Sequence, residues 1–142
     1  MLRIKPATTY EEAQAVMFYE VPKTKRTIFM RAGSLERSKA FFELLGNPQN
    51  NRKTLHMAGT SGKGSTVHMI DRLLLTHGKT TCLHVSPHVY DVRERLTVNG
   101  AYVREEDFVK YINTLIPAVE TMSETDFNRP TYYEVSTALG FL

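Results

Sequence analysis

The stretch His56-Met57-Ala58-Gly59-Thr60-Ser61-Gly62-Lys63-Gly64-Ser65-Thr66 places three glycines and a lysine between a short apolar segment and a helical pattern. Glycine has no Cβ atom, so backbone N–H groups in such a loop can approach an anion closely. Residues 53–58 are expected to form a strand. The apolar residues after the loop recur at helical spacing and predict a helix with a buried face: Val67, Met69, Ile70, Leu73 and Leu74. The stretch therefore predicts a phosphate-binding loop at a helix N-terminus.

The candidate nucleotide-binding residues are those of the loop itself: Gly59, Thr60, Ser61, Gly62, Lys63, Gly64, Ser65 and Thr66. Lys63 is the candidate catalytic residue, because its charge can neutralise β and γ phosphate oxygens, while Ser65 or Thr66 can offer a hydroxyl. The spacing is a variant of the P-loop pattern G-x-x-x-x-G-K-[ST], since Met57 replaces the first glycine and Gly64 follows the lysine. The alternative is an ordinary glycine-rich connection.

The composition is that of a globular protein, with 142 residues of which 42% are hydrophobic and 23% are charged. No apolar run is long enough to cross a bilayer, and residues 1–10 lack the apolar core of a secretory signal. We therefore expect a cytoplasmic protein without membrane contact. Cys82 is the only cysteine, so no internal disulfide can form, and its surroundings favour a buried strand thiol.

Basic residues gather ahead of and within the second expected helix: Lys23, Lys25, Arg26, Arg31, Arg37 and Lys39. A run of this kind is usually a solvated face, although it can also attract an anionic substrate. No aromatic residues are interleaved in a pattern typical of nucleic-acid binding, so we expect no nucleic-acid partner.

The remaining pattern predicts helices and strands around the loop. Thr8 and Thr9 are candidate caps for a helix that begins near Tyr10, and Ser34 can cap a second helix. Residues 80–85 read as a strand, which with the strand at 53–58 would form a parallel βαβ unit. Residues 96–102 read as a hairpin around an Asn-Gly turn. Two more helices are expected over 105–122, with an apolar face from Phe108 to Met122, and over 131–142.

The string H-x-A-G-T-x-G-K-G-S-T resembles the phosphate loop of the folylpolyglutamate synthase and dihydrofolate synthase branch of the Mur ligases. Other Mur ligases tend to carry threonine directly after the lysine, so Gly64 favours the folate branch, while Ser61 replaces the usual asparagine. Further landmarks are similar to those of the family and come in the same order: 45–49 (Leu-Gly-Asn-Pro-Gln), 86–88 (Ser-Pro-His), 94–95 (Glu-Arg) and 99–100 (Asn-Gly).

The resemblance implies two magnesium ligands. Ser86 matches the serine of the family's Ser-Pro-His, and Glu134 matches the glutamate of its Thr-x-Phe-Glu motif, in which Tyr133 here replaces phenylalanine. Taken alone, Ser86 reads as a turn residue and Glu134 as a solvated helix residue. The sequence leaves open whether four further residues contact a ligand or serve the loop and the core: His88, Arg93, Arg95 and Phe141.

The resemblance implies an α/β fold, namely a P-loop-type three-layer domain with a mainly parallel sheet, an N-terminal helical extension and a β-hairpin loop. Residues 1–52 are assigned to a helical segment packed on the nucleotide domain, and residues 53–142 to the front part of a Mur-ligase-type ATP-binding domain. In the family the segment around the hairpin forms a mobile loop over the active site.

The implied function is that of the ATP-binding portion of an ATP-dependent amide ligase, which adds glutamate to a folate through an acyl phosphate and uses ATP and Mg²⁺. The family's downstream magnesium histidine, carbamylated lysine and C-terminal domain have no counterpart in these residues. We therefore expect the chain alone to be incomplete, to bind nucleotide weakly at best, and not to ligate. The alternative is a free-standing nucleotide-binding or interaction module.

Overall fold

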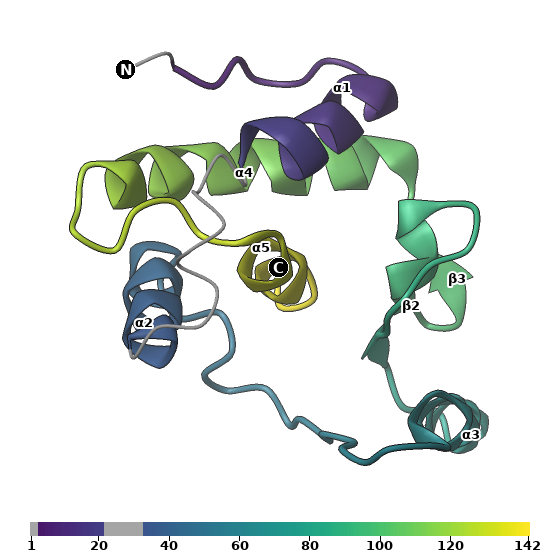
Figure 1. Ribbon diagram of the computed structural model, residues 1–142. Coiled ribbons are helices and arrows are strands. Elements are labelled where there is room, and N and C mark those ends of the chain that lie inside the picture. Colours follow the sequence, from purple (N-terminus) through teal and green to yellow (C-terminus); the bar gives the residue numbers. More distant parts are fainter. Residues whose placement is uncertain (1–2, 22–32) are drawn as a thin grey trace. The chain divides into compact units, whose positions relative to one another are not determined.

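A computed structural model describes residues 3–21 and 33–142 of the chain (Figure 1). The chain divides into two compact units, one made of Met1–Asn51 with Glu105–Leu142 and the other of Arg52–Arg104. The prediction of domains at 1–52 and 53–142 drew its boundary near the same residue but assigned residues 105–142 to the phosphate loop's domain. In the structure these residues pack with the N-terminal segment.

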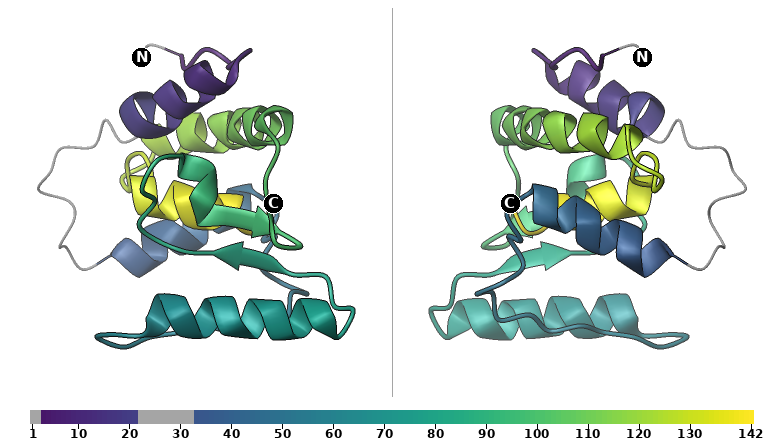
Figure 2. Two further views of the ribbon diagram at one scale, coloured as in Figure 1. Left: turned by 90° about the vertical axis from the view of Figure 1, so that its right-hand side faces the viewer. Right: turned by 90° about the vertical axis from the view of Figure 1, so that its left-hand side faces the viewer.

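The first unit is helical. It contains α1 (Tyr10–Ala15), which continues as a π-helical turn η1 (Val16–Glu20), and then α2 (Ser34–Leu44), α4 (Glu105–Ser123) and α5 (Tyr132–Leu139). Figures 1 and 2 show α1 on one side of α4 and α5 on the other. The Thr9 side chain caps α1 by accepting a hydrogen bond from Glu12 N, as the sequence predicted.

The core of this unit lies along α4. Its inward face carries Phe108, Ile112, Leu115, Val119 and Met122, all of which are buried, so the apolar face predicted from the sequence is confirmed. Residues from the neighbouring helices complete the core: Ala13, Met17, Phe41, Val135 and Ala138. The segment before α1 is tied to α4 as well, because Asn113 accepts from Ala7 N and donates to Ala7 O, each at 2.8 Å.

The second unit contains α3 (Lys63–Thr76), three short strands and a 3₁₀ turn, η3 (Val92–Arg95). The strands β1 (Cys82–His84), β2 (Leu96–Val98) and β3 (Ala101–Tyr102) form one antiparallel sheet in the order β1-β2-β3, with Leu83 opposite Thr97. Asn99 and Gly100 turn between β2 and β3 with φ of 51° and 78°. Positive φ at both positions suits a tight hairpin, so the predicted Asn-Gly turn is confirmed.

The described residues do not form the parallel βαβ unit that the sequence predicted. Residues 53–58 form neither helix nor strand, and every pair of strands in the sheet is antiparallel. A parallel strand needs hydrogen-bonding neighbours and cover on both faces. The described part of this unit supplies one helix and one small antiparallel sheet, which is too little to hold a central parallel strand.

The buried face expected on α3 is also wrong. Met69 is 66% exposed and Leu73 is 60% exposed, whereas Asp71 is the buried residue of this helix. Within its unit α3 packs against β1, a strand of three residues, which is too short to cover an apolar helix face. Cys82 is exposed instead of buried, because side chains alternate along a strand and Leu83 takes the inward position.

The basic residues expected to form a solvated face divide into two groups. Lys23, Lys25, Arg26 and Arg31 lie outside the described residues, and Lys39 is exposed on α2. Arg37 contradicts the expectation, since it is only 5% exposed. Its burial has a specific cause, an acidic partner on α5.

Candidate nucleotide-binding loop and acidic site

The predicted phosphate loop leads directly into α3. Residues 59–62 form a bend, and the helix begins at Lys63 with Gly62 as its N-cap. Gly59 has φ of 148° and Gly62 has φ of 76°, a region that L side chains rarely adopt, so glycine is required at both positions. Residues 59–66 are all exposed. The N–H groups of the first helical turn have no partner within a helix and therefore can bind an anion.

Lys63 folds back over this loop. Its Nζ donates hydrogen bonds to the carbonyl oxygens of Gly59 and Thr60, the second at 3.3 Å. These bonds hold the ammonium group beside the helix N-terminus, so the positive charge and the free N–H groups lie at the same place. Gly64 has no atom within 4 Å of an added Cβ and its φ is not positive, so packing within the chain does not explain this glycine.

The Ser86 candidate lies in a loop that is held together by one carboxylate. Glu94 accepts hydrogen bonds from the backbone N–H groups of Val89, Tyr90 and Asp91, at 2.7, 2.9 and 2.9 Å. These bonds lower the pKa of the Glu94 carboxyl. Ser86 itself is exposed and precedes a cis peptide bond to Pro87.

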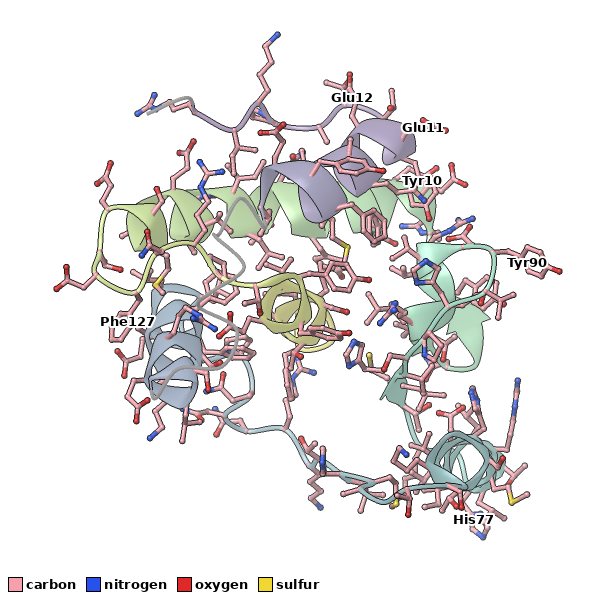
Figure 3. The ribbon with its side chains drawn as sticks, in the orientation of Figure 1. Tyr10, Glu11, Glu12, His77, Tyr90 and Phe127 are labelled. Carbon is pink, nitrogen blue, oxygen red and sulfur yellow. The ribbon has the colours of Figure 1, made fainter. Side chains whose placement is uncertain are left out.

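The structure shows what two of the residues left open by the sequence, Arg93 and Arg95, contact within the chain. Arg93 pairs with Asp91, with Nη2 2.7 Å from Oδ2, so its guanidinium group forms a salt link within the loop. Arg95 is buried and its Nε donates to His88 Nδ1 at 2.7 Å. Both arginines therefore stabilise the loop. The side chain of Tyr90, in the same loop, points away from it with 94% of its surface exposed (Figure 3).

Phe141, the fourth of the residues left open, lies beside α2. Its ring meets that of Phe42 edge to face, with centroids 6.0 Å apart. This contact supports the interpretation that Phe141 is a packing residue.

Glu134 lies in the first turn of α5, where it forms a capping box with Thr131. The Thr131 hydroxyl accepts from Glu134 N, and Glu134 Oε2 accepts from Thr131 N at 2.6 Å. Two residues of α2 reach the same carboxylate. Arg37 Nε lies 3.0 Å from both oxygens, and Ser38 Oγ donates to Oε1 at 2.8 Å.

The electrostatics of Glu134 follow from this arrangement. Burial by itself raises the pKa of the carboxyl, but hydrogen bonds from Thr131 N, Arg37 and Ser38 outweigh that effect, and the pKa lies below its ordinary value of 4.5. Glu134 is therefore ionised and paired. Without the family resemblance the sequence predicted a solvated helix residue at this position, and that prediction is wrong. A sequence-based search could not have found Arg37, which lies 97 residues away.

A magnesium ion does not fit Glu134 in this arrangement, because donors of the chain already occupy both carboxylate oxygens. The exposed Ser86 hydroxyl belongs to the Arg52–Arg104 unit and Glu134 to the other. No group of three or more histidine, cysteine, aspartate or glutamate residues suited to a metal occurs in residues 3–21 and 33–142. In the same ranges, no helix combines the length and the apolar character needed to span a membrane.

Comparison with solved structures defines the class of protein. The folylpolyglutamate synthetase of Lactobacillus casei superposes with a TM-score of 0.80 at 29% identity, covering 94% of this chain and 32% of that chain. A complex of such a synthase with AMPPCP and folate gives a TM-score of 0.75 at 29% identity, again over 94% of this chain and 32% of its own. The fold is therefore of the α/β class of these synthases.

Comparison of sequences leads to the same proteins. The dihydrofolate synthase/folylpolyglutamate synthase of Bacillus subtilis (strain 168) is 37% identical over 108 residues, which are 76% of this chain. No established family model matches the sequence. The chain is related in sequence and in fold to the folylpolyglutamate synthase family. It spans 25% of the Bacillus protein and so corresponds to a part of it.

Proposed function

We propose that this chain is the ATP-binding portion of an ATP-dependent amide ligase of the folylpolyglutamate synthase type. The observation that carries the proposal is the exposed glycine loop, in which Gly59 and Gly62 take left-handed conformations and Lys63 lies at the N-terminus of α3. The relatives support it, since one is solved with the nucleotide analogue AMPPCP and with folate.

The proposed reaction uses the loop to hold a triphosphate. The N–H groups of the loop and of the first turn of α3 bind phosphate oxygens, and Lys63 neutralises the charge that develops on the transferring group. A carboxylate oxygen of a folate attacks the γ phosphorus of ATP, so that ADP leaves and an acyl phosphate forms. The amino nitrogen of glutamate then attacks the acyl carbon, and phosphate leaves as the amide bond forms.

The proposal includes features that belong to the whole protein. Residues 53–58 become a strand of a mainly parallel sheet once neighbouring strands are present, in a P-loop-type three-layer domain. Glutamate and folate are substrates, and a C-terminal domain is a required partner. Mg²⁺ is a proposed cofactor with Ser86 and Glu134 as ligands, but Glu134 can take a metal only after one of its present hydrogen bonds is released, so no reaction step is assigned to the ion. The proposed location of the protein is the cytoplasm, in keeping with its proposed use of ATP.

Nucleotide binding by the loop can be tested on the 142-residue chain. Calorimetric titration with ATP is expected to show weak binding, and Lys63→Ala is expected to weaken it about tenfold or more, because the loop loses its cation. Lys79→Ala is the matched control, since Lys79 is an exposed lysine just beyond the other end of α3. Equal effects of the two substitutions would contradict the assignment of the loop.

Ligation can be tested on the longest natural form of the chain, supplied with ATP, Mg²⁺, glutamate and a reduced folate. The expected result is folate-dependent release of ADP together with a lengthened folate. Absence of both would favour the second candidate function, an interaction module without ligase activity. The exposed apolar residues Met69 and Leu73 on α3 are the observation that favours this second candidate.

A further inference from the structure

The helices α2 and α5 begin beside each other at a hollow of about 350 Å³. Both helices belong to the same compact unit. The residues that line the hollow come from the beginnings of the two helices, among them Ser34 and Arg37 of α2 and Tyr133 and Glu134 of α5. The positive ends of two helix dipoles therefore lie at one place.

The start of α2 has no side-chain cap. Its N-cap is Gly33, and the first backbone hydrogen bond of the helix runs from Arg37 N to Gly33 O at 2.9 Å. The N–H groups of Ser34, Leu35 and Glu36 therefore have no acceptor within the part of the chain that the structure describes. The start of α5, by contrast, is closed by a capping box. Unpaired donors at the positive end of a dipole favour an anion at the start of α2.

A second observation at the same place is the side chain of Arg37, which is only 6% exposed and lines the hollow. Its Nε group donates to both carboxylate oxygens of Glu134, each at 3.0 Å. The Nη groups carry the remaining N–H bonds of the guanidinium, and no residue in 3–21 or 33–142 accepts a hydrogen bond from them. Donors of a buried charged group cost free energy when they are left unsatisfied. Arg37 therefore points to an acceptor that the described residues do not supply.

The charges around the hollow favour an anion. The charge of Glu134 is offset by Arg37 and by hydrogen bonds from Ser38 and Thr131 N. Because this ion pair is neutral overall, the two helix dipoles decide the sign of the field, with about half a positive elementary charge each. Glu36, in the first turn of α2, is exposed and is not among the residues that line the hollow. The planar, forked guanidinium matches the oxygens of a carboxylate or phosphate group, so the ligand class is an oxyanion.

We propose that the hollow at the start of α2 and α5 binds an oxyanion, namely a carboxylate or phosphate group of a small molecule. The Nη groups of Arg37, the Ser34 hydroxyl and the free N–H groups of the first turn of α2 hold its oxygens. Leu35 and Tyr133 border the hollow and are 60% and 61% exposed, so they offer apolar contacts to the remainder of the molecule. The site does not depend on the phosphate loop, which belongs to the other unit.

The test follows the backbone amide signals of Leu35 and Glu36 by NMR in the 142-residue chain. Sodium phosphate and sodium acetate are added in separate titrations at constant ionic strength and pH. A saturable shift of these signals is expected with at least one of the two anions. Saturation by phosphate alone identifies a phosphate site, and saturation by acetate alone identifies a carboxylate site.

Ser34→Asp is the variant that tests the site without disturbing the fold. It places a fixed carboxylate at the hollow, and an acidic residue suits the first turn of a helix. The midpoint of the titration is expected to need at least about tenfold more anion, because two like charges would meet. Thr114→Asp is the matched control, since it adds the same charge at an exposed position of α4 in the same unit, and it is expected to leave the titration unchanged.

Arg37→Lys is a further variant that keeps a positive charge beside Glu134 but lacks the forked donors, so it is expected to weaken binding about tenfold. The inference is overturned if neither anion gives a saturable shift, or if Ser34→Asp and the unaltered chain titrate alike. Lys63→Ala removes the cation of the phosphate loop and is expected to leave the response of these amide signals unchanged. Failure of nucleotide binding and failure of this inference are therefore distinguishable.

Discussion

The pairing of Arg37 with Glu134 predicts a large and non-additive loss of stability when either residue is replaced. Both side chains are buried, at 6% and 10% exposure. Removing one partner of a buried pair costs about 3–5 kcal/mol, because the other charge is left without compensation. Glu134 keeps its bonds from Ser38 and Thr131, so we expect the lower value, about 3 kcal/mol, for Arg37→Met.

The assay is urea unfolding of the chain at pH 7 followed by far-UV circular dichroism, with the free energy extrapolated to water. Glu134→Gln is expected to cost a similar amount. The double variant is expected to cost less than the sum of the two, by about 2 kcal/mol, because the two charges are removed together. Lys39→Met is the control on the exposed face of α2, with an expected change within about 0.5 kcal/mol. Single losses below about 1 kcal/mol that simply add would refute the reasoning.

The same pair predicts a dependence of stability on pH. The folded-state pKa of Glu134 is lowered from its ordinary value of 4.5, so its stabilising contribution is complete above that value. The contribution is lost as the pH falls from about 4.5 through the lowered folded-state pKa. The difference in urea midpoint between the unaltered chain and Glu134→Gln is therefore expected to shrink on acidification. A difference that stays constant from pH 7 down to pH 3 would contradict this.

Four further substitutions test other parts of the structure by the same unfolding assay. Gly100→Ala is expected to cost about 1–2 kcal/mol, because φ is +78° and a Cβ would lie 2.9 Å from a guanidinium nitrogen, whereas Gly64→Ala, in open space with ordinary φ, is expected to stabilise by about 0.5 kcal/mol. Asn113→Leu removes two hydrogen bonds to the N-terminal segment and is expected to cost about 1–3 kcal/mol, with faster amide exchange in that segment. Leu73→Ser is expected to change stability by less than about 0.5 kcal/mol, since the side chain is 60% exposed. A loss of 2 kcal/mol there would show that α3 is covered.

Local signals in the sequence predicted local structure correctly. The apolar face from Phe108 to Met122 follows from helical spacing, and the turn at Asn99-Gly100 follows from the tolerance of these two residues for positive φ. The glycine loop lies directly before a helix for the same kind of reason, because Gly62 permits the left-handed bend that starts α3. Each of these signals involves residues that are close along the chain.

The errors concern features that depend on distant residues. Burial of Met69 and Leu73 and strand formation at 53–58 require neighbouring elements, and periodicity does not reveal whether those neighbours are present. The assignment of Arg37 to a solvated face failed because a carboxylate 97 residues away draws the guanidinium inward. Glu134 combines the two cases. Its capping box with Thr131 is a local pattern that a sequence can reveal, whereas its ion pair with Arg37 is a long-range contact that a sequence does not reveal.

The Glu94 carboxylate has a consequence for how the Ser86 loop can move. The Glu94 side chain accepts hydrogen bonds from the N–H groups of Val89, Tyr90 and Asp91, and the neighbouring Arg95 donates one to His88. These hydrogen bonds join residues 88–95 into a single stiff segment. Rotation about backbone dihedrals is therefore concentrated at the two ends of this segment. The exposed Tyr90 ring therefore moves together with the whole segment. Because the segment is already ordered, it has little backbone entropy left to lose when it contacts a ligand.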